Sequence, residues 1–124
     1  MNNGDIAEHF SLLSKLMDIH GENSFKSKTY SIAAFHIEKL EQPLTETDRQ
    51  SIASFKGLGP SVAAKVIELL DTGSMSVLQE FIDNTPEGVR EMLRIKGLGP
   101  KKIHTVWQEM GIQSIGELEY ACNE

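Results

Sequence analysis

Lys56-Gly57-Leu58-Gly59-Pro60 recurs unchanged as Lys96-Gly97-Leu98-Gly99-Pro100, forty residues further along a chain of 124 residues. Apolar residues beside the two copies also correspond: Ile52 with Met92, Phe55 with Ile95, Ala63 with Ile103, Val66 with Val106 and Ile67 with Trp107. Five identical residues with matching flanks indicate an internal repeat. Each copy therefore predicts a helix, a glycine turn and a second helix.

The rest of the chain also has a helical pattern, because apolar residues return every three or four positions. We expect a first helix from a cap at Asp5 to Met17, a second through 30–40, and a short third one that Thr45 starts together with Asp48 and that runs to Phe55. Further helices are expected through 62–70, from a capping box at Ser76, from a Thr85 cap followed by Pro86, through 103–110, and from a cap at Ser114. No segment alternates with a period of two, so the predicted fold class is all-α. We expect a first helical domain at residues 1–83 and a second helix-hairpin-helix unit at 84–124.

The glycine turns have the chemistry of an oxyanion site. Glycine leaves the backbone N–H groups uncovered, and proline at the first helical position loses no hydrogen bond. The helix after each turn therefore begins with free N–H groups at its positive end, where a phosphate can bind. The predicted phosphate-binding residues are Gly57, Gly59, Gly97 and Gly99, with Lys101 and Lys102 after the second turn. A simple connection between packed helices is the alternative interpretation.

The charge distribution favours a polyanionic partner at the repeats, although the chain has a net charge of -6. Residues 90–104 contain five Lys or Arg and one acid, a local charge of +4 that leaves -10 for the rest. Lys56 and Lys65 form a second basic segment without acids. A bound phosphate responds to the field within about 10 Å, so these segments matter more than the total.

Composition excludes several protein classes. With Cys122 as the one cysteine, neither a disulfide framework nor a paired-cysteine zinc site is possible. The apolar runs are too short for a membrane span, and no secretory leader precedes the first helix, so we expect a cytoplasmic protein. Nucleotide-binding glycine loops need a further glycine where Val62 and Lys102 stand. The histidines (His9, His20, His36 and His104) lack metal-ligand spacing and are expected to be surface or core residues, with His104 a candidate phosphate contact.

The repeated Gly-Leu-Gly-Pro with its flanks resembles the tandem helix-hairpin-helix of family X DNA polymerases, the DNA polymerase beta family, especially its bacterial members. Residues 16–34 are similar to the helical domain that grips the 5' phosphate of gapped DNA, and residues 89–111 to the second hairpin. The resemblance implies a monomer that binds gapped or nicked duplex DNA in base excision repair. It also implies that hairpin carbonyls hold a monovalent cation, Na or K; the corresponding residues are Phe55, Leu58, Leu93, Ile95 and Leu98.

The same resemblance implies a site for 5'-deoxyribose phosphate lyase chemistry. Lys65 stands at the position of the Schiff-base lysine, and Tyr30 and Lys26 match a tyrosine and a phosphate-binding lysine of that pocket. Ser61 departs from the pattern, because lyase-proficient members carry lysine there. The loss of that neighbouring positive charge makes the attacking amine harder to activate. We therefore expect weak lyase activity or none.

Polymerase chemistry needs paired carboxylates that hold magnesium, and the aspartates of this chain are isolated in the sequence. We expect magnesium only in a polymerase domain outside this chain, which would make the chain a part of a larger polymerase. The alternative is a stand-alone DNA-binding or protein-docking module without enzymatic activity. The net charge of -10 outside residues 90–104 is compatible with protein docking.

Overall fold

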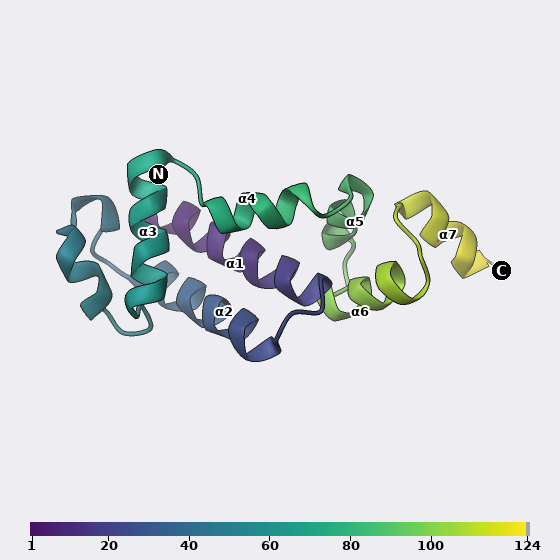
Figure 1. Ribbon diagram of the computed structural model, residues 1–124, viewed down its shortest axis with the longest axis horizontal. Coiled ribbons are helices and arrows are strands. Elements are labelled where there is room, and N and C mark those ends of the chain that lie inside the picture. The colour runs from purple at the N-terminus through teal and green to yellow at the C-terminus, as the bar shows by residue number, and fades with distance from the viewer. Residues whose placement is uncertain (124) are drawn as a thin grey trace.

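The computed structural model describes residues 1–123, which form a chain of short and medium helices (Figure 1). The elements in chain order are α1 (Asn3–Ile19), α2 (Ser24–Lys39), η1 (Leu44–Glu46), η2 (Arg49–Ser54), α3 (Pro60–Thr72), α4 (Ser76–Asp83), α5 (Glu87–Glu91), η3 (Met92–Arg94), α6 (Pro100–His104), η4 (Thr105–Glu109) and α7 (Ile115–Asn123). Strands are absent from these residues, so the predicted all-α class is confirmed. None of the described helices has the length and apolar character needed to cross a membrane.

α1 lies at the centre, with α2 along one side, α4 along another and α6 at its carboxyl-terminal half (Figure 1). The expected stripe of Ile6, Phe10, Leu13 and Met17 is buried, and so are apolar residues outside it: Ala7, Leu16 and Ile19. Three helices packed on different sides require this wider apolar surface. The helix starts earlier than expected, because Asn2 is its cap and Asp5 reaches back to the Asn2 N–H as the second half of a capping box.

Other helix starts also differ from the sequence prediction. The segment before the first hairpin forms the 3-10 helices η1 and η2 instead of an α-helix, with bonds such as Ser51 N–H to Asp48 O. Ser76 is the first residue of α4 and donates to Glu68 across the connection, so the predicted capping box does not form. The predicted cap at Thr85 is also wrong, since its hydroxyl donates to the Phe81 carbonyl oxygen. The cap at Ser114 is confirmed by its bond from the Glu117 N–H.

The repeat forms two hairpins of the same local geometry. Gly57 and Gly97 have φ of +83° and +86°, a left-handed conformation that favours glycine. In each turn the leucine N–H donates at 3.1 Å, from Leu58 to Phe55 O and from Leu98 to Ile95 O. Helices α3 and α6 then begin at proline, as predicted, and α6 continues into the single π-helical turn η4.

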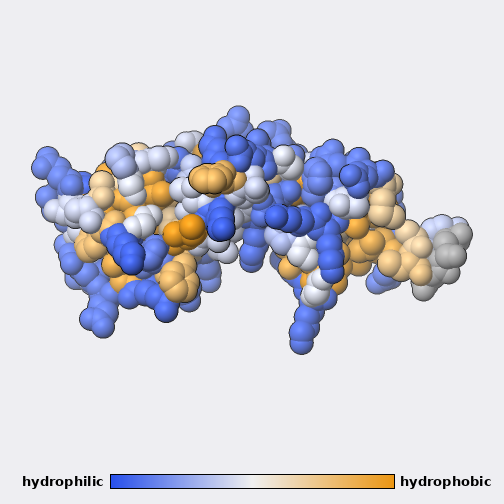
Figure 2. Space-filling view, turned by 90° about the horizontal axis from the view of Figure 1, so that it is seen from below, coloured by the Kyte–Doolittle hydropathy of each residue, from blue (hydrophilic) through white to orange (hydrophobic). Residues whose placement is uncertain are grey.

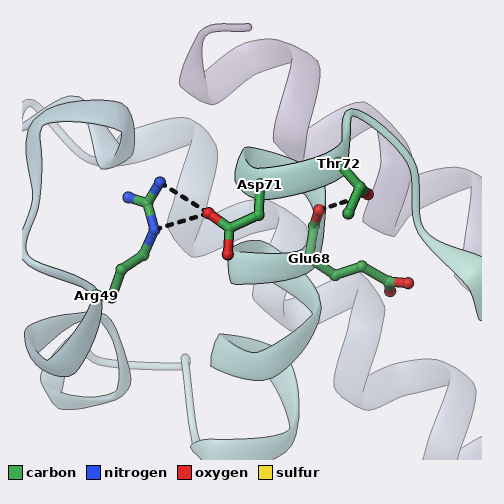
Figure 3. Close-up of polar contacts among 4 residues, drawn as sticks. All are labelled: Arg49, Glu68, Asp71 and Thr72. Atoms are coloured by element: carbon green, nitrogen blue, oxygen red, sulfur yellow. Dashed lines mark hydrogen bonds and ion pairs between the residues drawn. The ribbon is translucent and has the colours of Figure 1, made fainter.

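The first hairpin is braced from outside the repeat. Arg49 of η2 donates from Nε and Nη2 to Asp71 of α3, which ties the two arms together (Figure 3). Both side chains are about half exposed, so the ion pair adds at most about 1 kcal/mol. On the other side, the His36 ring of α2 lies so close to Gly57 that a Cβ at this position would overlap it. Nothing lies within 4 Å of the corresponding point at Gly97.

The second hairpin is held against the end of α1 by two histidines. His104 of α6 donates from Nδ1 to the Ile19 carbonyl oxygen over 2.8 Å, and a Cβ on Gly21 would lie 2.7 Å from its ring. The His20 ring meets Trp107 and Phe81 edge-on, with centroids 5.0 and 5.3 Å away. Burial lowers the pKa of His20, an effect that His104 reinforces and Glu22 opposes.

The different surroundings of the two turn glycines predict different costs of substitution. Gly97→Ala should lower the free energy of unfolding by about 1 to 2 kcal/mol, because alanine disfavours positive φ. Gly57→Ala should cost about 1 to 3 kcal/mol more, since its Cβ also meets His36. Chemical denaturation measures both values. The double variant His36→Ala/Gly57→Ala should recover the extra cost, and equal costs in the two single variants would contradict the bracing by His36.

The lowered pKa of His20 predicts a pH-dependent stability. As the pH falls below about 6.5, the unfolded chain binds a proton at residue 20 that the folded chain resists, so the free energy of unfolding decreases. Denaturation at pH 7.5 and 5.5 should show a larger loss for the parent than for His20→Gln. His9→Gln, on the opposite half of α1, is the matched control and should keep the parental dependence. An equal loss in His20→Gln would refute this assignment.

Candidate nucleic-acid interface

Several backbone N–H groups at the start of α3 donate no hydrogen bond to another described residue. Ala63 donates to Gly59 O, whereas the N–H groups of Gly59, Ser61 and Val62 have no acceptor among the described residues. In the second hairpin Ile103 donates to Gly99 O, and the N–H groups of Lys101 and Lys102 are unpaired in the same way. Both hairpins thus have unpaired donors at the positive end of a helix, and those of Gly59, Ser61, Lys101 and Lys102 belong to exposed residues.

The second glycine of each hairpin is not required by the backbone. Gly59 and Gly99 have φ of -66° and -80°, values that any residue adopts. No atom lies within 4 Å of where their Cβ would stand, so close packing does not require glycine there either. A side chain at either of these exposed positions would cover the unpaired N–H groups. The second glycine therefore keeps room for an outside acceptor.

The basic residues predicted to assist the hairpins take different places. Lys102 reaches back to Gly97 O over 3.5 Å and stays exposed, while Lys101 borders a groove between α1 and α2 that also includes Asp18 and Lys28. His104 is partly buried through its bond to Ile19, so the structure gives it a packing contact, and its predicted phosphate contact stays a prediction. Hydrophilic side chains dominate the face in Figure 2, and the apolar ones form separate patches, one of them toward α7.

The residues predicted for lyase chemistry come together in one pocket, of about 560 Å³, between α1, α2, α3 and α4. Lys65, Ser61, Tyr30 and Lys26 all line it. The Lys65 Nζ donates to Ser61 Oγ over 3.3 Å and lies 5.2 Å from the centre of the Tyr30 ring. Tyr30 is buried and stacks on Phe10, so α1 fixes the wall against which the lysine lies.

The pocket also contains ionisable residues that the sequence analysis did not select. His20 and Glu22 come from the end of α1 and the turn after it, and Glu80 comes from α4. The sequence did not indicate these three residues as pocket residues, because they are far from Lys65 in the chain and no local motif connects α1 or α4 with α3. With Lys26 and Lys65 they give the pocket two positive and two negative side chains beside the histidine.

The described residues contain no group of three or more His, Cys, Asp or Glu side chains placed to hold a metal ion. The carbonyls predicted to bind a monovalent cation have acceptor capacity to spare. Those of Phe55 and Ile95 each accept one bond inside the hairpin, and those of Leu58 and Leu98 accept none from the described residues. Leu58 is fully buried and the other four residues are half-buried, so a monovalent cation at these carbonyl oxygens stays a prediction.

Comparison with known proteins identifies the family. The helix-hairpin-helix domain family matches residues 1–75. The chain is 30% identical over all its 124 residues to the DNA polymerase/3'-5' exonuclease PolX of Bacillus subtilis (strain 168), of which it covers 21%. It is 26% identical over 114 residues, 91% of its length, to DNA polymerase lambda of Rattus norvegicus, of which it covers 19%. The chain thus spans about a fifth of the length of these relatives, both of them family X polymerases. It belongs to the helix-hairpin-helix domain family and is a homologue of the family X DNA polymerases.

Proposed function

We propose that the chain is the DNA-backbone-binding region of a family X DNA polymerase that acts on gapped or nicked DNA in base excision repair. The observation that carries this proposal is the pair of hairpins with unpaired N–H groups at Gly59, Ser61 and Val62 and at Lys101 and Lys102. Phosphate oxygens accept from such donors, and this contact is independent of the base sequence.

The positions of the hairpins support a partner with two separate backbone segments. The first hairpin lies between η2 and α3 at one end of the molecule, and the second lies before α6 toward the other end (Figure 1). A gapped duplex presents backbone on both sides of the interruption, so each hairpin has a segment to bind. A monovalent cation at the carbonyls of Phe55 and Leu58, or of Leu93, Ile95 and Leu98, would add an attraction for phosphate.

The proposed backbone contacts predict a strong effect of salt. The logarithm of the association constant should fall with the logarithm of salt concentration with a slope of roughly -3 to -5, as about four to six phosphate contacts require. Fluorescence anisotropy with a gapped duplex that carries a 5' phosphate measures this slope. Intact duplex of the same length should bind more weakly, and unrelated base sequences should bind alike. A slope near zero at measurable affinity would indicate the protein-docking alternative.

The pocket favours a second activity, weak 5'-deoxyribose phosphate lyase chemistry through Lys65. Its amine lies next to Ser61 and the Tyr30 ring, and Lys26 in the same pocket supplies a positive charge for a phosphate. A lysine at position 61 would repel the ammonium form of Lys65 and thereby favour the neutral nucleophile. Serine only accepts a hydrogen bond from it, so we infer a slow reaction.

Borohydride trapping on an incised abasic duplex tests the role of Lys65. The parent should give a weak covalent adduct that disappears in Lys65→Ala and becomes stronger in Ser61→Lys, because the added charge favours the neutral amine. Lys15→Ala, at an exposed lysine of α1 outside the pocket and outside both hairpins, is the matched control for trapping. Adduct that persists undiminished in Lys65→Ala would assign the chemistry to another amine.

A further inference from the structure

His20 packs against the second hairpin and also lines the Lys65 pocket, where its ring has a chemical role still to be assigned. It lies at the end of α1 and lines the pocket together with Lys65, Tyr30 and Glu80. Its ring is held on two sides by the aromatic rings of Phe81 and Trp107. A histidine fixed in this way keeps one orientation, which is the first requirement for transferring a proton at a defined atom.

Hydrogen bonding assigns the tautomer of His20. The Thr85 hydroxyl has one proton and donates it to the Phe81 carbonyl oxygen. The Thr85 Oγ1, which lies 2.7 Å from His20 Nε2, must then accept the Nε2–H. In the neutral ring the lone pair is therefore on Nδ1, which has no hydrogen-bond partner among the described residues. Thr85 is 3% exposed, so water competes little for this contact.

The surroundings keep His20 in the form that accepts a proton. Burial lowers its pKa, and the neighbouring His104 acts in the same direction, while Glu22 opposes them. At neutral pH the imidazole is thus uncharged, and the residue that carries this unpartnered nitrogen lines the same pocket as Lys65. The other proton acceptors that line the pocket are the carboxylates of Glu22, from the turn after α1, and Glu80, from α4.

We propose that His20 Nδ1 is the base that removes the C2' proton in the lyase reaction, an inference that rests on the proposed chemistry of Lys65. Lys65 Nζ adds to the C1' aldehyde of the opened deoxyribose and water leaves, which forms a protonated imine. His20 takes the C2' proton, and the electron pair moves through the enamine to break the C3'–O bond. The phosphate leaves with that bonding pair as the 5' end of the downstream strand. Water then hydrolyses the conjugated imine and returns Lys65.

Separate assays of the two steps test this assignment on an incised abasic duplex. In His20→Gln the borohydride-trapped adduct should be at least as strong as in the parent, because imine formation does not use His20. Release of the 5'-phosphorylated strand under single-turnover conditions should be slower by on the order of 100-fold, the typical contribution of a general base. His9→Gln should match the parent in both assays.

A second pair of variants covers the case in which the substitution at residue 20 disturbs the fold. Thr85→Val removes the acceptor that orients His20 and should slow strand release while trapping is retained, and Thr85→Ser should behave as the parent. Parental release from His20→Gln would overturn the proposal, and slow release from Glu80→Gln instead would assign the base to that carboxylate. If the parent forms no trapped adduct at all, the lyase function itself is refuted. If the parent forms the adduct and His20→Gln releases the strand at the parental rate, only the role of His20 is refuted.

Discussion

Burial of α1 on several sides is the constraint on which the rest of the structure depends. α2, α4 and α6 all pack on this helix, and residues such as Phe10, Leu13 and Leu16 have no exposed surface. Because close-packed apolar side chains allow little sliding, each partner helix has a fixed position along α1. The lysine pocket opens where α2, α3 and α4 approach the end of α1, so its shape is a consequence of the core.

The two glycines of each hairpin perform different tasks. Gly57 and Gly97 supply a backbone conformation that other residues resist, whereas Gly59 and Gly99 leave N–H groups uncovered in an ordinary conformation. The first glycine belongs to the fold and the second to the surface that a ligand would meet. In the proposed function, this division lets an identical five-residue sequence serve both stability and binding, and His36 braces the first hairpin alone of the two.

The end of α1 connects the pocket with the second hairpin. Ile19 accepts from His104, while His20, the next residue, lines the pocket and meets Trp107 of η4. A shift of the second hairpin would therefore change the packing of a pocket side chain. In the proposed function, DNA binds at the second hairpin and a sugar phosphate binds beside Lys65. The adjacent residues Ile19 and His20 connect these two places.

The sequence by itself determined the all-α class, the two hairpins and the four pocket residues that the resemblance selected, because these follow from local periodicity, from glycine and proline preferences and from a shared motif. It predicted wrong starts for several helices. Thr85 and Ser76 bond to residues of preceding helices, Phe81 and Glu68, and the capping box of α1 stands earlier than predicted, formed by Asn2 and Asp5. Only the tertiary structure brought His20 to the pocket and His36 to the first hairpin. Those contacts join residues that are far apart in the sequence. The distance between such residues is set by the packing of whole helices, which no local sequence pattern encodes.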